Sequence, residues 1–453
     1  MIWIKMENFM FDSKKRHYLP EYLLWAVAVV FFAVIVYILF CREVFLSEEM
    51  NWFWVNGGIG IAFFYSFFYC LFLIFSASSA QRWKEPEEKG NISGCTVIVP
   101  AYNEGKHVMT ALNSLLAADF PPGKLQIIAV NDGSKDDTLS WINKVADKSG
   151  GMISVVDLPE NRGKKHALYT GIKMADHEFI VTVDSDSTVK KDALKKLLYP
   201  FADPAVGAVA GTLNKKADAL NFHTQMCDVM LVFGCSLLRR AQSRWGNVFC
   251  TPGALSAYRR SALLPVLDEW LDQTFMGVPS RIGEDRAIAT LLLGRNWQIV
   301  YQPEAEAETC LPESYTGVVK MLLRWTRSDF RENIMMPGKV FSAMKFNRLR
   351  SWDCFIHWLL LSVNMLSALW ILPAVILFFA GPGGWLYKTA LFLAANVLWS
   401  IFPALIYWHR KRSFLRMIWA LVFGFYSQFA LFWIGIYSLL TMRDSRWLTR
   451  EIP

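Results

Sequence analysis

Acidic and basic residues follow short apolar runs at several points in the middle of this chain. Asp132 follows the run at 125–130, and Asp184 and Asp186 follow the run at 179–183. Lys164 stands just before a stretch with a helical pattern. Two carboxylates two residues apart at a strand end can reach one divalent cation or its ligands, and lysines at a helix start can bind an anion. The pattern predicts a site for Mg²⁺ or Mn²⁺ and a diphosphate.

Each of these pieces also has a simpler interpretation. Asn-Asp-Gly-Ser at 131–134 is a common turn, Gly-Lys-Lys at 163–165 can be a solvated helix start, and Asp-Ser-Asp at 184–186 can cap the helix that follows. None of these motifs indicates a function by itself. The spacing of the motifs together indicates a functional site, because it brings acidic and basic residues to one edge of one sheet.

The elements that would position these residues are alternating strands and helices. Apolar runs predict strands, and a helical pattern covers 108–118; the strands are expected at 96–100, 125–130, 153–158, 179–183 and 206–211. This alternation predicts a βαβ sheet. Ligands of such sheets bind beyond the carboxyl ends of the strands, where the polar residues collect.

The composition indicates a membrane protein with a water-soluble middle. Of 453 residues, 54% are hydrophobic and only 19% are charged, and most of the charge lies between about 82 and 350. This excludes a wholly soluble protein, a disordered chain and a disulfide scaffold. We attribute the net charge of +8 to segments that flank membrane spans, and no nucleic-acid partner is expected. The eight cysteines form no C-x-x-C pair, which argues against a zinc site.

Apolar runs at both ends predict membrane spans. Two precede the central region and three follow it; they lie at 22–40, 52–77, 355–380, 389–408 and 417–441. The distribution of Lys and Arg places the N-terminus, the central region and the basic loop at 409–412 in the cytoplasm. Five spans would leave the C-terminus outside. This conflicts with three arginines in the last residues, so a re-entrant or interfacial last segment is an alternative.

The ordered motifs resemble the family-2 glycosyltransferases of the GT-A fold. They are most similar to the membrane-embedded processive β-glycan synthases, which make hyaluronan, chitin and chito-oligosaccharides, poly-N-acetylglucosamine or cellulose. The resemblance covers roughly residues 95–335 and rests on PAYNE (100–104), VNDGS (130–134), NRGKK (161–165), DSD (184–186), TPGA (251–254), GEDR (283–286) and RW (324–325). It implies an α/β GT-A domain, a mixed sheet flanked by helices, inserted between transmembrane helices.

The resemblance also implies roles for individual residues. Asp285 would be the general base, and Asp184 with Asp186 would bind the metal and the diphosphate. The remaining assignments are uridine binding by Ala101, Tyr102, Glu104 and Asp132, a position near the nucleotide for Lys164, diphosphate contact by Arg324, sugar stacking by Trp325, and acceptor binding by Thr251, Pro252, Gly253 and Glu284. Without this context, Glu284 and Asp285 would be read as an acid pair at a helix start.

One residue departs from the family pattern. The family has Q-x-x-R-W, and Met321 occupies the glutamine position here. The missing polar contact weakens the case for ordinary processive elongation. The cationic helix at 320–331 is equally expected to lie on the anionic inner leaflet.

These observations define four regions and a leading hypothesis. The regions are an N-terminal membrane region at 1–81, a cytosolic GT-A domain at 82–311, interfacial helices at 312–352 and a C-terminal membrane region at 353–453. We expect a multi-pass protein of the cell (inner or plasma) membrane that transfers sugar from a UDP-sugar to a growing polysaccharide with inversion and translocates the product. The alternatives are transfer of a single sugar to a lipid and an inactive scaffold, and the intact aspartates argue against the scaffold. The sugar and the oligomeric state are left open.

Overall fold

A computed structural model describes residues 65, 68–81, 83–85, 94–216, 221–344, 348–380, 384–411 and 414–446. The predicted span at 22–40 and the first part of the one at 52–77 lie outside the described residues. The description therefore concerns the central domain and the helices that follow it.

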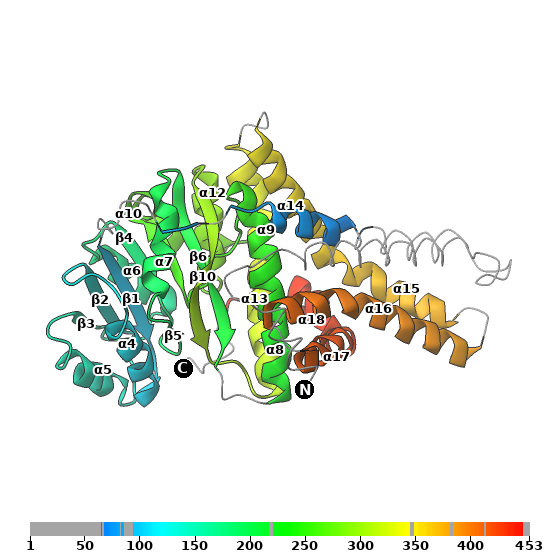
Figure 1. Ribbon diagram of the computed structural model, residues 1–453, viewed down its shortest axis with the longest axis horizontal. Coiled ribbons are helices and arrows are strands. Elements are labelled where there is room, and N and C mark those ends of the chain that lie inside the picture. The colour runs from blue at the N-terminus through cyan, green and yellow to red at the C-terminus, as the bar shows by residue number, and fades with distance from the viewer. Residues whose placement is uncertain are drawn as a thin grey trace, which may run out of the picture.

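The central domain is built on one eight-stranded sheet (Figure 1). In the order β3-β2-β1-β4-β7-β6-β10-β5, its strands are β3 Ile153–Asp157, β2 Leu125–Asn131, β1 Cys95–Ala101, β4 Phe179–Thr182, β7 Ser256–Arg259, β6 Val206–Lys215, β10 Gln298–Thr309 and β5 Thr188–Val189. Every residue of β1 is buried. Continuous apolar runs of this kind are typical of parallel strands covered on both faces.

The sheet is mixed, as predicted. β1 pairs in parallel with both β2 and β4, and β2 pairs in parallel with β3. β7 runs antiparallel to β4 and β6, β10 runs parallel to β6, and β5 runs antiparallel to β10. The five predicted strands are confirmed with small shifts at their ends. The strands β5, β7 and β10 were not predicted.

Helices join these strands and enclose the core. They are α4 Val108–Leu116, α5 Thr138–Ala146, α6 Lys164–Lys173, α7 Ala193–Leu198, α10 Arg260–Leu263, α11 Leu267–Leu271 and α12 Glu284–Gly294. α6 packs on β1 and β2, and α12 packs on β6 and β10. The largest apolar cluster lies between these layers. A two-stranded hairpin, β8 Thr274–Phe275 and β9 Val278–Pro279, precedes α12.

Two helices separate the sheet domain from the C-terminal helices (Figure 1). α8 (Phe222–Val232) continues through a π-helical segment, Phe233–Arg239, into α9 (Arg240–Gln242). α13 (Tyr315–Met336) contacts α8 and continues into a second π-helical turn, Pro337–Phe341. α13 is longer than the cationic helix predicted at 320–331.

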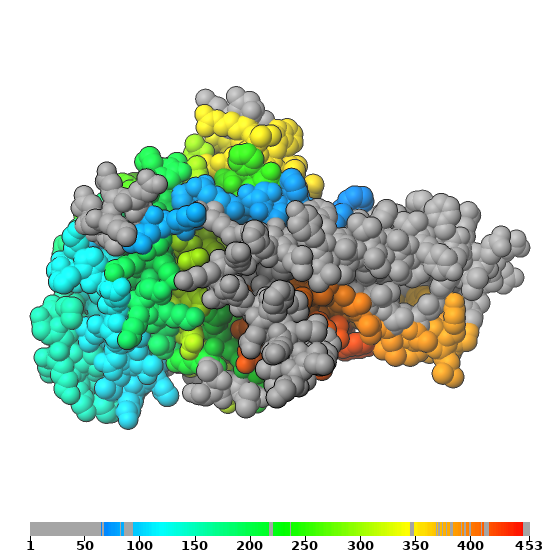
Figure 2. All heavy atoms as spheres, in the orientation of Figure 1, coloured from blue at the N-terminus to red at the C-terminus, as the bar shows by residue number. Residues whose placement is uncertain are grey.

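The C-terminal region contains α14 Leu349–Leu366, α15 Ala368–Ala380, α16 Trp385–Lys411, α17 Phe414–Ala430 and α18 Phe432–Leu440. α16 projects away from the sheet domain, as its orange atoms show in Figure 2. In the described part of the chain, no single helix is long and apolar enough to cross a membrane. The segments 416–430 and 432–440 meet that requirement only together, and they are bent by 45° at their junction.

Ion pairs attach the C-terminal helices to the sheet domain. Asp228 on α8 is 1% exposed, and it accepts hydrogen bonds from Tyr407 Oη at 2.5 Å and Lys411 Nζ at 3.0 Å. Glu306 on β10 pairs with Arg410 at 2.7 Å. The end of α16 is thereby tied to both α8 and the sheet.

Candidate active site

The carboxyl ends of β1 and β4 lie side by side at the point where the strand order reverses. The chain adds β2 and β3 on one side of β1 and then returns to place β4 on the other side. Such a switch point is where open α/β sheets bind ligands. Glu104, just after β1, accepts a 2.8 Å hydrogen bond from the Ser185 hydroxyl, just after β4. Ala101 ends β1 at this point, Tyr102 follows it, and both residues are buried. The structure therefore brings two of the predicted motifs together.

Asp132 holds the loop that leads into α6. Its two oxygens accept the backbone N–H groups of Arg162 at 3.0 Å and Gly163 at 2.9 Å. Burial raises the pKa of Asp132, and the two amide bonds act against that rise. Gly163 has a φ of 94°, which glycine adopts without the penalty other residues incur. The predicted uridine ligand is thus also the residue that fixes the start of α6.

Lys164, the first residue of α6, bridges two carboxylates. Its Nζ lies 2.6 Å from Asp184 Oδ1 and 2.8 Å from Glu284 Oε1. Burial lowers the pKa of Lys164, but the attraction of the two carboxylates outweighs burial and leaves the pKa above its usual range. Glu284 is also buried, and the charges of Lys164 and Arg324 bring its pKa below the usual value. A residue after β4 is thus joined to the first residue of α12.

The TPGA loop covers this bridge. A Cβ added to Gly253 would lie 2.6 Å from Lys164 Nζ and 3.3 Å from Asp184 Oδ1. Thr251 is fully buried, and its hydroxyl donates to the Asp285 carbonyl at 3.1 Å. Pro252 accepts a hydrogen bond from Ser256. Gly253, predicted on the acceptor side, therefore sits at the carboxylate predicted to bind the metal, and Thr251 braces the start of α12.

Asp285 contacts different residues from those that its neighbour Glu284 contacts. Its Oδ1 accepts the backbone N–H of Arg286 at 2.8 Å, and its Oδ2 lies 3.5 Å from the Cys250 thiol. Burial, followed by the charge of Glu284, raises the pKa of Asp285. Gly283 starts the helix at a φ of 75°, and a Cβ there would lie 1.6 Å from Ser328 Oγ on α13. This close approach places α12 directly against α13.

α13 supplies the Arg-Trp motif. The charge of Arg324 acts on Glu284, and the Trp325 side chain stays 37% exposed. Met321 is buried in an apolar cluster with Cys227 and Val318. The residue that replaces the family glutamine thus packs against α8, and it contributes no polar group to the site.

The two aspartates after β4 fit a divalent cation by their chemistry. No cluster of three or more His, Cys, Asp or Glu able to hold a metal occurs among the described residues. Mg²⁺ and similar ions commonly bind one or two carboxylates and take their remaining ligands from substrate phosphates and water. Asp184 and Asp186 supply such a pair; Asp186 Oδ1 also accepts from Ser187 at 3.3 Å. Metal binding here would depend on a phosphorylated substrate.

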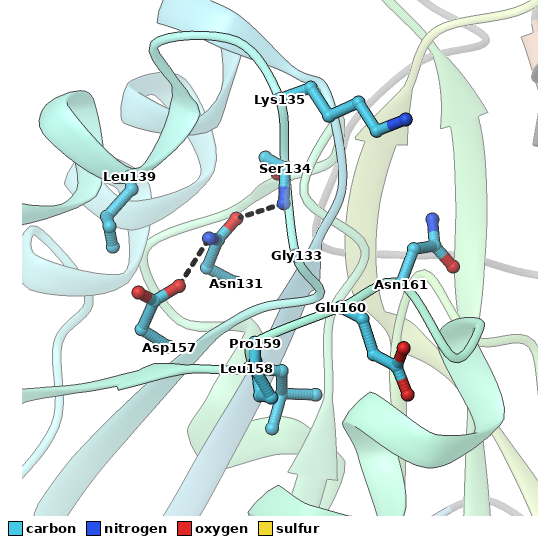
Figure 3. A pocket seen from close by; sticks show the side chains of 10 residues that line it. All are labelled: Asn131, Gly133, Ser134, Lys135, Leu139, Asp157, Leu158, Pro159, Glu160 and Asn161. Carbon is cyan, nitrogen blue, oxygen red and sulfur yellow. Dashed lines mark hydrogen bonds between the residues drawn. The ribbon is translucent and has the colours of Figure 1, made fainter. Parts of the chain in front are cut away.

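A cavity of about 490 Å³ lies beyond the ends of β2 and β3 (Figure 3). Asn131 and Asp157 form one wall and are joined by a 2.7 Å hydrogen bond, and Leu139 of α5 faces them. The other lining residues are Gly133, Ser134, Lys135, Leu158, Pro159, Glu160 and Asn161. The cavity therefore lies next to the Asp132 loop, and neither Lys164 nor Asp285 lines it.

Two residues near Asp285 were not predicted from the sequence. Cys250 immediately precedes the TPGA motif, and Asp329 follows Trp325 by four residues. The spacing of four along a helix was an available signal for Asp329, because it places two side chains on one face. No sequence pattern predicted that Cys250 would contact Asp285.

The fold and the site together define a sugar-transferring enzyme that uses a nucleotide-linked donor, and comparisons with known proteins agree. Residues 96–266 match the glycosyl transferase family 2 profile. An N-acetylglucosaminyltransferase of Azorhizobium caulinodans is 32% identical over 78% of this chain and 87% of its own length. An N-acetylglucosaminyltransferase of Rhizobium meliloti is 30% identical over 82% of this chain and 85% of its own length. The chain therefore belongs to glycosyl transferase family 2.

A solved structure supports the fold. A mannosyltransferase from Pyrobaculum calidifontis, in complex with GDP-Man and Mn²⁺, superposes with a TM-score of 0.58 over 89% of this chain and 99% of its own. Its sequence identity is 20%. The predicted GT-A type of fold, with a mixed sheet flanked by helices, fits this likeness.

Proposed function

We propose that this protein is an inverting membrane β-glycosyltransferase that transfers N-acetylglucosamine from its UDP derivative to a growing polysaccharide. The observation that carries the proposal is the bridge that Lys164 forms between Asp184 and Glu284 beside Gly253, with Asp285 next to Glu284 at the start of α12. The choice of sugar rests on the relatives named N-acetylglucosaminyltransferases. The uridine would lie near Tyr102 and Asp132, at the end of the sheet.

The residues divide the work between a donor side and an acceptor side. Lys164 and Arg324 carry positive charge on the side where a diphosphate would leave. Asp285 contacts the Cys250 thiol, and a buried carboxylate with a raised pKa is a stronger base than an ordinary one. It would take the proton of the acceptor hydroxyl as that oxygen attacks C1 and the bond from C1 to the diphosphate breaks. A single displacement of this kind would invert the configuration at C1.

A divalent cation held by Asp184 and Asp186 would supply positive charge that disperses the charge on the leaving diphosphate. The bridge from Lys164 to Asp184 means that Asp184 exchanges partners when the donor arrives. Gly253 leaves the room for this exchange, because it has no side chain beside the two charged groups.

We further propose that the protein resides in the cell (inner or plasma) membrane with its catalytic domain in the cytoplasm, and that it translocates its product. Support comes from the apolar runs in the sequence and from the bent pair at 416–430 and 432–440. The attachment of α16 to Asp228 and Glu306 supports a direct connection between catalysis and these helices.

Transfer of a single sugar to a lipid is the second candidate, and Met321 favours it. Its burial beside Cys227 removes the polar group that the processive family places there. The two candidates differ in product size. Long polymers of mixed length support the synthase, whereas a single lipid-linked sugar supports the alternative.

The test uses the full-length protein purified in detergent, with a panel of labelled UDP-sugars and sizing of the products. The Asp285→Asn variant should lower turnover by about 10²–10⁴-fold, the usual contribution of a general base, while UDP binding is retained. Asp119→Asn is the matched control, since that exposed carboxylate pairs only with Lys195 among the described residues. Normal turnover in Asp285→Asn would refute the base assignment.

A further inference from the structure

Asp329 on α13 lies near the proposed base Asp285. Its side chain is 47% exposed, and its Oδ1 lies 3.6 Å from Nε of Arg286, the residue after Asp285. Burial of its surroundings and the nearby Asp285 raise the pKa of Asp329 to about 6. Asp329 is therefore a carboxylate close to Asp285 that solvent can still reach.

Arg286 holds the two carboxylates next to each other. Its backbone N–H donates to Asp285, and its guanidinium donates to the Phe249 carbonyl at 2.6 Å and stacks on the Phe249 ring. The Arg286 side chain is only 3% exposed, so it cannot swing away from Asp329. The buried Arg286 therefore contacts both carboxylates.

Asp329 keeps hydrogen-bonding capacity. Among the described residues it makes one ion pair, at a distance longer than a hydrogen bond, and it accepts no hydrogen bond. An ionised carboxylate can accept about four. Trp325 lies one turn earlier on the same face of α13 and is also partly exposed. The Trp325 ring and a carboxylate that can still accept hydrogen bonds therefore lie on one face of α13. Such a surface is suited to a sugar, which presents apolar C–H faces and hydroxyl groups.

We propose that Asp329 binds the acceptor: it accepts a hydrogen bond from a hydroxyl group of the acceptor sugar next to the hydroxyl that Asp285 deprotonates. This proposal rests on the proposed function and names a specificity-determining residue for it. Arg324, on the neighbouring face of α13, acts toward Glu284 and the donor. α13 would thus serve both substrates, with Arg324 on the donor side and Asp329 on the acceptor side.

The test compares Asp329→Asn and Asp329→Ala with the wild type, using chito-oligosaccharide acceptors and UDP-N-acetylglucosamine. Loss of a charged hydrogen bond is worth about 1.5–3 kcal/mol, so KM for the acceptor should rise about ten- to hundredfold in Asp329→Ala. Calorimetric affinity for UDP and the melting temperature should stay unchanged. Asp119→Asn is again the control, because it removes a charge of the same kind from an exposed surface.

The outcomes separate this proposal from the proposed function. An unchanged acceptor KM, or an equal loss of UDP affinity, would overturn the role of Asp329. If the wild type transfers no sugar at all, the proposed function fails, and direct calorimetric binding of a chito-oligosaccharide then tests Asp329 independently. Weaker binding in Asp329→Ala than in the wild type would support the acceptor role in that case, and equal binding would refute it.

Discussion

Lys164 Nζ lies 2.8 Å from Glu284 Oε1, and the same ammonium group lies 2.6 Å from Asp184. A residue at the start of α6 thus connects the end of β4 to the start of α12. The Glu284 side chain is 7% exposed, so its charge depends on this partner. This pair, which lies at the proposed donor side of the site, is also a structural link in the domain.

Replacing Lys164 with Met should destabilise the protein. Removing one partner of a buried pair leaves the other charge uncompensated, which typically costs about 3–5 kcal/mol. The Lys164→Met/Glu284→Gln double variant should recover part of this loss, because it removes the orphaned charge. Thermal unfolding of the purified protein, arranged as a double-mutant cycle, measures the coupling.

The control for this cycle is Lys195→Met. Lys195 pairs with Asp119, whose side chain is 66% exposed, and such exposed pairs contribute about 0–1 kcal/mol. Strictly additive effects of the Lys164 and Glu284 substitutions would show that the two side chains do not interact.

The pH dependence of transfer should reveal the Cys250–Asp285 contact. Asp285 must be ionised to act as a base, so activity is present above its pKa and is lost as the pH falls through it. Burial and the charge of Glu284 raise that pKa. The acidic limb of the pH profile, where activity is lost, should therefore lie at a higher pH than the usual pKa of a carboxyl group. The Cys250 thiol acts in the opposite direction and lowers the pKa of Asp285.

Cys250→Ala should therefore shift the acidic limb of kcat to higher pH and leave the alkaline plateau nearly unchanged. Cys250→Ser keeps a donor and should stay close to the wild type. The measurement is a kcat profile against pH for the three proteins. An identical limb in Cys250→Ala would mean that the thiol has no influence on the base.

Alanine substitutions at two glycines should affect two different properties, ligand binding and stability. A Cβ at Gly253 meets the end of the flexible Lys164 side chain, which can move, so Gly253→Ala should fold normally and weaken UDP binding. A Cβ at Gly283 meets Ser328 at 1.6 Å on a backbone with positive φ, and Gly283→Ala should lower stability by about 2–4 kcal/mol. Melting temperature and UDP affinity separate the two effects. A stable Gly283→Ala variant would contradict the close packing of α12 against α13.

Chelation should stop transfer, and Mg²⁺ or Mn²⁺ should restore it. Asp186→Asn should raise the metal concentration needed for half-maximal activity, because it removes one of the two carboxylates proposed to hold the metal. Binding of Mn²⁺ should be weak without UDP and stronger with it, since phosphates complete the ligand set. Full activity in chelator would remove the metal from the proposed function.

The sequence predicted the strands that carry the donor site. Runs such as 96–100 and 179–183 are apolar throughout because both faces of a parallel strand are buried, and this signal is local. β10 escaped prediction because Pro303 interrupts its apolar run, and its register with β6 shifts between Tyr301 and Glu306. β7 was missed as well; it is four residues long and stands between strands that are distant in the sequence.

The motifs in the sequence determined which residues take part, and the tertiary structure decided how they are paired. The residues Glu284 and Asp285 are adjacent, so no sequence pattern could show that one faces Lys164 and the other Cys250. That separation depends on the helical turn after Gly283 and on two loops that arrive from elsewhere in the chain. The position of Asp329 beside Asp285 likewise depends on the packing of α13 against α12. Such contacts join residues far apart in sequence, and only the packed fold specifies them.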